Sequence, residues 1–427
     1  MHTRYYALIS LSLFKTSLIF TVLALIVLLI LSVIKYSAAQ PSIIKDTSLK
    51  VEPIVSGLSS PTSMAFLDND NILVLEKGGQ VRLVSNGQLQ QQPVLQVPVD
   101  TQSERGLLGI AIINNTKSDV TDVRAKTVFL YYTESQDVGE LRNRIYRYEW
   151  NGQSLVNPKL ILDLPALRGP NHDAGKIVIG PDNYLYAVIG DLNHRGNLQN
   201  INNGPQPDDT GVILRINGSD GSPASENPFS TNDNSAMHRY YAYGIRNSFG
   251  LAFDPVTGNL WDTENGPDVY DEINIVKPGF NSGWIQVMGP ISRNTGITEG
   301  QLVNFPGSHY ADPVFSWRNP VAVTDIEFMK SSKLGANYQN NIFVGDNNNG
   351  NLYFFKVNKD RTGIDLEYSN QQSAGLSDLV VDNNEELSAI TFGTGFGSIT
   401  DIKTGPDGFL YALSFDDGSI YKISPLQ

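Results

Sequence analysis

Histidine is the side chain of this sequence best suited to proton transfer near neutral pH, because the imidazole pKa lies in that range. The chain has five histidines, and two of them, His172 and His194, stand on the loops around one predicted hairpin. Asp173 follows His172 directly, so a carboxylate lies beside the imidazole in the sequence. A histidine at the end of a strand with a carboxylate nearby can act as a general base, which makes both His172 and His194 candidates. A hydrogen-bonded structural histidine would look the same, so the local sequence leaves both interpretations open.

A turn rich in oxygen ligands lies farther along the chain. Gly266 and Pro267 are followed by the acids Asp268, Asp271 and Glu272. Ca²⁺ binds backbone carbonyls and carboxylates in a flexible oxygen shell, and this turn supplies both kinds of ligand. It is therefore a candidate calcium loop. An acidic turn that faces solvent is the alternative.

A short sequence pattern recurs six times after Gln40 and predicts the strands that would position these residues. Each copy is a short apolar stretch, a turn with Asp, Asn, Gly or Pro, and a second apolar stretch rich in Tyr, Leu and Val. The copies begin at Met64, Ile110, Ile177, Leu251, Ile326 and Ile402. Each copy predicts two antiparallel strands, and a third alternating strand usually follows, as in 350–355 and 418–423.

Strand groups that repeat without amphipathic helices between them predict an all-β fold, a propeller of six blades over residues from about 45 to 427. Uneven spacing of the copies places long loops in the middle blades, where sites are usually built. Two stacked β-sandwiches are the alternative, but they would not explain why one pattern recurs six times.

Composition excludes several classes of function. The chain of 427 residues is 41% hydrophobic and carries 38 Gly and 22 Pro, which indicates a sizeable core with many turns. A formal net charge of -13 argues against binding to nucleic acid or to an anionic membrane surface, both of which need a basic face. The sequence has no cysteine, so it forms no disulfide or thiolate metal site.

The N-terminus predicts export. Arg4 and Lys15 precede the uncharged, Leu/Ile/Val-rich run 17–34, and small residues follow at 37–39. This pattern fits a cleaved signal peptide or a retained membrane anchor over residues 1–40. In both cases we expect the domain at 41–427 to lie outside the cytoplasm, with the N-terminal segment as its only contact with a membrane.

Several motifs resemble the glucose/sorbosone dehydrogenases, the soluble sugar-oxidising quinoproteins. The matching blocks are His172-x-x-Gly175, Gly190-Asp191, Arg246-Asn247-x-x-Gly250, Glu264-x-Gly266-Pro267, Asp271-Glu272-Ile273-Asn274, Gly283-Trp284, and the earlier block Gly106-Leu107-Leu108-Gly109. The resemblance covers about residues 50 to 427 in one order. It implies a six-bladed β-propeller of four-stranded antiparallel blades, with pyrroloquinoline quinone (PQQ) lying on one end and calcium polarising its reactive carbonyl.

The resemblance also implies roles for individual residues in the oxidation of a sugar. His172 corresponds to the base that takes the proton of the anomeric hydroxyl, with Asp173 and Asn171 as orienting neighbours. Arg246 and Asn247 correspond to contacts of the quinone.

For the metal, the resemblance implies that the carbonyls of Gly266 and Pro267 bind the calcium. We expect Asp271 and Glu272 to support this site.

The sequence departs from the family at the contacts to the three carboxylates of PQQ. A lysine and two arginines are expected there, but 345–350 reads Gly-Asp-Asn-Asn-Asn-Gly and 397–401 reads Gly-Ser-Ile-Thr-Asp. Three lost charge-assisted hydrogen bonds would cost several kcal/mol at about 1.5–3 kcal/mol each. Candidate replacement cations are Arg318, Lys403 and Arg105. Arg105 follows Glu104, which stands where the family has a glutamine and is itself a candidate contact of the quinone.

Two hypotheses follow from these observations. The first is an exported quinoprotein that oxidises a sugar or similar polyol and passes electrons to an acceptor that the sequence does not identify. The second is a binding propeller that keeps calcium but has lost the quinone. His172 and the Arg246-Asn247 pair favour the first hypothesis, and the missing cations favour the second.

Overall fold

The computed structural model describes residues 41–114, 126–135, 140–169, 172–365 and 375–426. The chain divides into two units, Met1–Pro41 and Ser42–Gln427, and the architecture is that of the second. The signal peptide or anchor expected at 1–40 lies outside the described residues. Within the described ranges, no helix combines the length and the apolar character needed to cross a bilayer.

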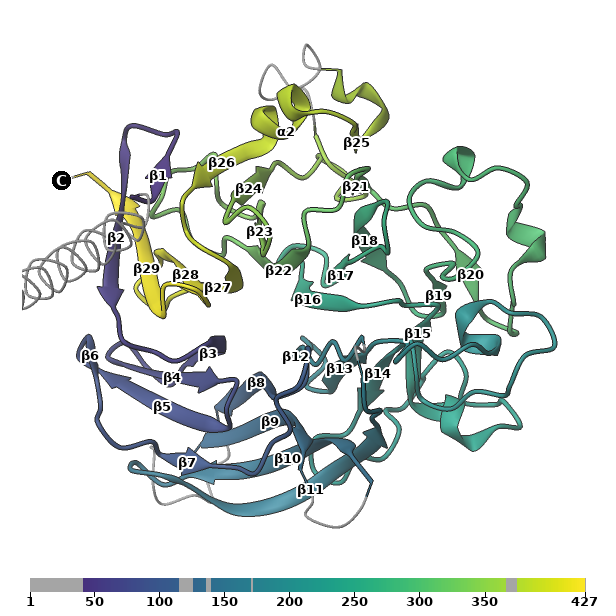
Figure 1. Cartoon of the computed structure of the whole chain (residues 1–427), viewed down its shortest axis with the longest axis horizontal. Coiled ribbons are helices and arrows are strands. Elements are labelled where there is room, and N and C mark those ends of the chain that lie inside the picture. Colours follow the sequence, from purple (N-terminus) through teal and green to yellow (C-terminus); the bar gives the residue numbers. More distant parts are fainter. Residues whose placement is uncertain (1–40, 115–125, 136–139, 170–171, 366–374, 427) are drawn as a thin grey trace, which may run out of the picture. The chain divides into compact units, whose positions relative to one another are not determined.

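The strands in the described ranges form six sheets that follow one another around a ring (Figure 1). Three sheets have their innermost strand in the first half of the chain. They are β3 (Pro61–Phe66), β4 (Asn71–Glu76), β5 (Gln80–Ser85) and β6 (Gln88–Leu89), with β7 (Leu95–Gln96) also on β5; β8 (Leu107–Asn114), β9 (Lys126–Glu134), β10 (Arg142–Trp150) and β11 (Leu155–Pro165); and β12 (Ile177–Ile179), β13 (Leu185–Ile189), β14 (Val212–Ile216), β15 (Tyr240–Tyr243), β19 (Phe280–Asn281) and β20 (His309–Tyr310).

The other three sheets have their innermost strand in the second half of the chain, and two of them take an outer strand, β1 or β2, from near the N-terminus. They are β16 (Ser248–Phe253), β17 (Leu260–Glu264), β18 (Asp271–Val276), β21 (Phe315–Trp317) and β25 (Val380–Val381); β22 (Val323–Phe328), β23 (Ile342–Asp346), β24 (Leu352–Phe355), β26 (Thr391–Thr394) and β1 (Ile43–Ile44); and β27 (Ile399–Thr404), β28 (Leu410–Ser414), β29 (Ser419–Pro425) and β2 (Leu49–Val55). Short helices lie in the connections: η1 (Asn197–Gln199), η2 (Ser235–Arg239), η3 (Ile291–Arg293), η4 (Glu299–Gln301), η6 (Leu376–Asp378) and α2 (Asn384–Ile390).

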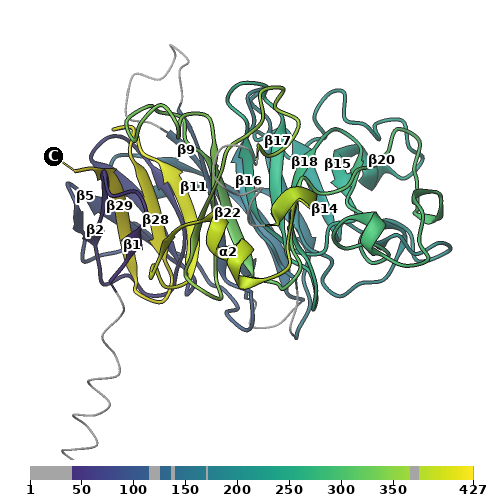
Figure 2. The same ribbon diagram turned by 90° about the horizontal axis from the view of Figure 1, so that it is seen from above.

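The innermost strands contact one another in a closed circle that runs β3, β8, β12, β16, β22, β27 and back to β3. Their apolar side chains and those of the second strands are buried between neighbouring sheets; every residue of β13 and of β22 is buried. Viewed from the edge, the strands run across the thickness of the ring (Figure 2). This arrangement is an all-β propeller, in which each sheet buries its faces only against its neighbours.

The two ends of the described chain meet in one sheet. Strand β2, near the N-terminus, pairs antiparallel with β29, the last strand, from Leu49 opposite Pro425 to Val55 opposite Ile420. Residues separated by almost the whole chain thus share one hydrogen-bonded ladder. This ladder closes the ring.

The expectation of four antiparallel strands in every blade is wrong. Only two of the sheets formed by the described residues have four strands; the others have five or six. Short segments from the long connections add outer strands, and β15 with β19, β19 with β20 and β21 with β25 pair in parallel. Long loops carry unpaired backbone groups, and pairing with a sheet edge satisfies them.

Candidate active site

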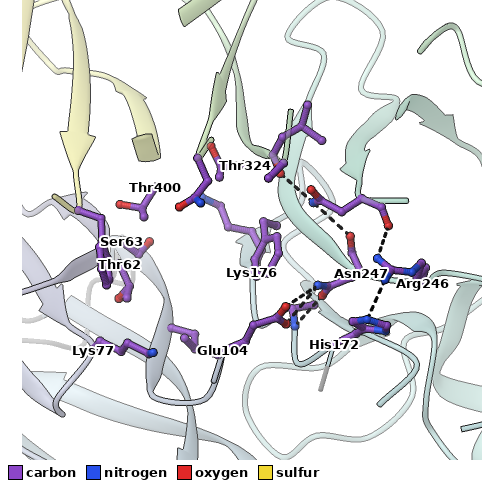
Figure 3. Close-up of a pocket in the computed structure, with 18 residues that line it drawn as sticks. Thr62, Ser63, Lys77, Glu104, His172, Lys176, Arg246, Asn247, Thr324 and Thr400 are labelled. Atoms are coloured by element: carbon purple, nitrogen blue, oxygen red, sulfur yellow. Dashed lines mark hydrogen bonds between the residues drawn. The ribbon is translucent and has the colours of Figure 1, made fainter. Parts of the chain in front are cut away.

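The described residues enclose a cavity of about 360 Å³ where the innermost strands meet their loops at one end of the ring (Figure 3). All six sheets or the loops beside them contribute to its wall. The polar lining side chains are Thr62, Ser63, Lys77, Glu104, His172, Lys176, Arg246, Asn247, Asn265, Thr324, Asn347 and Thr400. Because the strand ends of a propeller converge toward its axis, residues far apart in the sequence meet here.

His172 is held at the cavity wall by contacts to both ring nitrogens. Its Nδ1 lies 2.5 Å from Oδ1 of Asp191, and Nη2 of Arg246 lies 2.9 Å from its Nε2. A guanidinium can only donate, so Nε2 is the acceptor and Nδ1 carries the proton that it donates to Asp191. The unprotonated nitrogen of His172 therefore faces Arg246 and the cavity, which is the orientation a general base requires.

Asp191 is buried, and three N–H groups fix its carboxylate. Besides His172, Nε1 of Trp284 donates to Oδ2 at 2.8 Å and the backbone N–H of Asn193 donates to Oδ1 at 2.9 Å. Sequence reasoning gave Asp191 no role. Its position just after β13, in the hairpin that His172 precedes, was the signal that could have indicated one.

Arg246 lies between His172 and the turn that follows β17. Its Nη1 donates to the backbone oxygen of Asn265 at 2.8 Å, and its guanidinium carbon lies 5.3 Å from the ring centre of Trp284. Burial lowers the pKa of Arg246, while nearby carboxylates, Asp191 first among them, raise it. The guanidinium is thus a partly desolvated cation fixed against an aromatic ring.

Glu104 and Asn247 are bonded to each other in the cavity wall. The Asn247 amide donates to both carboxylate oxygens of Glu104, at 3.2 and 3.1 Å, and Asn247 accepts the backbone N–H of Ala174 at 3.2 Å. Burial raises the pKa of Glu104. The structure therefore brings together His172, Arg246, Asn247 and Glu104 from the predicted set.

Asp173 points away from this group, although it is the neighbour of His172. Its carboxylate is buried, accepts the Asn143 amide at 3.3 Å and does not line the cavity. Burial raises its pKa to about 6. Asp191, and not Asp173, is the acid that contacts His172; Asn171 lies outside the described residues.

The candidate replacement cations lie in different surroundings. Arg318 is exposed at the outer strand β21, 3.7 Å from Asp382, and Arg105 is buried against Asp100 at 2.7 Å; neither lines the cavity. Lys403 is held by two buried aspartates.

Two lysines that sequence reasoning did not assign do line the cavity. Lys176 lies 2.7 Å from Asp325 and 2.8 Å from Asp401, so its charge is compensated. Lys77, at the end of β4, donates to the backbone oxygen of Ser103 at 2.5 Å.

The proposed calcium turn directly follows Asn265 of the cavity wall. The Asp271 carboxylate is buried and accepts N–H groups from Gly266 at 3.0 Å and from Val321 at 2.8 Å. Glu272 is also buried and accepts the N–H of Gly289 at 2.5 Å. In the described part of the chain, no three acidic or histidine side chains form a group that could hold a metal ion. Any calcium at this turn would therefore depend mainly on backbone carbonyls.

Comparison with known sequences matches the chain to a family of sugar dehydrogenases. The family model for Glucose / Sorbosone dehydrogenase matches residues 58–422. Aldose sugar dehydrogenase YliI of Escherichia coli (strain K12) is 27% identical over 385 residues, which is 88% of this chain and 93% of that protein. Quinoprotein glucose dehydrogenase B of Acinetobacter calcoaceticus is 30% identical over 268 residues, 57% of this chain and 54% of that protein.

A solved structure shares the fold over the same length. The soluble aldose sugar dehydrogenase of Escherichia coli, in its apo-form, superposes with a TM-score of 0.67 at 25% identity, covering 88% of this chain and 100% of that one.

Proposed function

This chain belongs to the glucose/sorbosone dehydrogenase family, and on that premise we propose that it is an exported, PQQ-dependent aldose dehydrogenase with a six-bladed propeller. The relatives are oxidoreductases that act on sugars, as their names state. The observation that carries the proposal is the chain of contacts from Asp191 through His172 to Arg246 at the cavity wall.

In this proposal His172 accepts the proton of the sugar's anomeric hydroxyl at Nε2. Asp191 holds the required tautomer and stabilises the imidazolium that forms. Arg246 donates to Nε2 in the structure, so a substrate hydroxyl would take its place at the same lone pair. Bound PQQ would supply the two-electron acceptor for the hydride that leaves the anomeric carbon.

The cavity suits a planar tricarboxylate such as PQQ. Lys77 and Arg246 line it, and neither makes an ion pair within 4.0 Å with any residue that the structure describes. The Thr324 hydroxyl also lines it, in a residue only 7% exposed, and has no hydrogen-bond partner among the described residues. Cations and an unused hydroxyl are the donors that carboxylate and quinone oxygens need.

Calcium would be held at the turn by the carbonyls of Gly266 and Pro267. The crowding around Gly266 supports this, since a Cβ there would lie 1.9 Å from the carbonyl oxygen of Tyr270 and 2.2 Å from that of Val269. Backbone oxygens thus converge on this turn. Such an oxygen-rich turn suits a hard cation.

Reconstitution tests the proposal. Purified protein given PQQ and Ca²⁺ should bind the quinone saturably and oxidise an aldose, with electrons passed to an artificial dye. His172→Asn should keep quinone binding and lose about 10²–10⁴-fold in rate, the usual effect of removing a general base. If the wild-type protein binds calcium but no quinone, the chain is a calcium-containing binding propeller and the enzymatic proposal is wrong.

A further inference from the structure

We propose that Lys77 supplies the cation that meets a carboxylate of the bound quinone, in place of the basic residues expected at 345–350 and 397–401. This inference rests on the proposed function and names one of its contacts. The side chain comes from the end of β4 and reaches into the cavity beside Thr62 and Glu104 (Figure 3).

The first argument is that the charge of Lys77 is available. Among the described residues its ammonium group donates to a carbonyl, that of Ser103, and such a group has three donors. Burial lowers the pKa of Lys77 and the nearby Arg105 lowers it further, while Glu104 and Asp173 raise it. Among the described residues this ammonium group contacts a carbonyl and makes no ion pair, so a ligand carboxylate would supply the opposite charge.

The second argument is that the other candidate cations are already engaged. Lys176 and Lys403 share the buried aspartates Asp325 and Asp401, at distances of 2.6 to 2.9 Å. Breaking such a buried pair is costly, because it leaves a carboxylate without its partner. Arg105 is similarly fixed by Asp100.

The third argument is position. Lys77 belongs to the sheet of β3 and β4, while Arg246 precedes β16, and these sheets are not neighbours in the ring. Lys77 and Arg246, neither of which makes an ion pair with the described residues, thus approach the cavity from different sides. The hydroxyls of Thr62 and Thr400 lie on the Lys77 side in Figure 3. A flat ligand with carboxylates at its rim would be held at both edges.

The test is quinone affinity, measured by absorbance titration without any sugar. Lys77→Met should weaken PQQ binding about 10- to 150-fold, the worth of one charge-assisted contact. Lys77→Arg should stay within about threefold of wild type, because it keeps the charge. Added salt should weaken binding more in the wild type than in Lys77→Met, since a charged contact is screened. Thermal melting of each variant without quinone checks that the fold is retained.

Lys359→Met is the matched control, because Lys359 is exposed after β24 and does not line the cavity. It should leave the affinity unchanged. The inference is overturned if Lys77→Met binds PQQ within threefold of wild type, or if Lys359→Met loses as much. Saturable binding by the wild type with no effect of Lys77→Met would overturn this inference alone; absence of binding by the wild type would also overturn the proposed function.

Discussion

Replacing Asp191 by Asn should abolish most of the catalytic rate while leaving quinone binding intact. The Asp191 carboxylate accepts three N–H groups, from His172, Asn193 and Trp284, and it is buried. An amide has one acceptor oxygen, so its NH₂ group must face at least one of these donors.

The two orientations of the amide have different costs. If the NH₂ takes the place of Oδ1, it faces both His172 and the backbone N–H of Asn193. The backbone donor then loses its acceptor, Nδ1 of His172 must become an acceptor and its proton moves to Nε2, which removes the base; this costs about 10²–10⁴-fold in rate. If the NH₂ faces Trp284, the tautomer survives, but a buried donor is left unpaired at about 1–3 kcal/mol. In both orientations the substitution also removes the negative charge beside the imidazolium. We therefore expect a rate loss of about 10²-fold or more.

The assay is single-turnover reduction of the bound quinone by an aldose, followed in a stopped-flow instrument. The double variant His172→Asn/Asp191→Asn should be no slower than the slower single variant, because the two residues act as one unit. Asp254→Asn is the control: Asp254 is equally buried but pairs with Arg361, outside the cavity. A rate for Asp191→Asn within threefold of wild type, or an equal loss in Asp254→Asn, would refute the assignment.

Three further predictions follow. Arg246→Ala should weaken quinone binding by about 1.5–3 kcal/mol, and Arg246→Lys should not restore it, because the planar fork is lost; unchanged affinity in an absorbance titration would contradict this. Removing calcium with a chelator should lower the melting temperature, because calcium at 100 times its Kd adds about 2.7 kcal/mol to the free energy of unfolding. An unchanged melting temperature together with no saturable calcium binding would exclude the site. The folded-state pKa of Asp173 is raised from 3.8 to about 6, so its contribution to stability is complete below about pH 4 and is lost as the pH rises to 6. Asp173→Asn should therefore gain about 3 kcal/mol relative to wild type between pH 4 and 7 in denaturant unfolding, and a constant difference would contradict the cause given.

The two innermost strands of each sheet were predictable, because burial of both faces of the sheet requires a repeated pattern of apolar residues. Each copy of that pattern falls on the two innermost strands of a sheet, from β3 and β4 to β27 and β28. The outer strands β19, β20 and β25 were not predictable, since two-residue segments in long loops carry no periodicity of their own.

Site residues were predictable where one motif held them, and not where the contact joined distant loops. His172, Arg246 and Asn247 lie in motifs, and they meet at the cavity. Asp173 was expected to contact His172 as its neighbour, but its carboxylate accepts the amide of Asn143 from β10 in the neighbouring sheet. Lys77 lay in none of the motifs, and its place in the cavity wall follows from the position of its strand in the ring.

The pairing of β2 with β29 also sets the order in which the molecule can be completed. Strand β2 leaves the ribosome first among the strands of its sheet, but its partner is not made until about 370 residues later. At about 5–20 residues per second, β2 waits about 20–75 s for that partner. During this interval the backbone N–H and C=O groups of β2 that pair with β29 have no partner strand. The cavity also lacks the sheet that carries Thr400. A nascent chain of this protein is therefore unable to form the complete cavity until synthesis is almost finished.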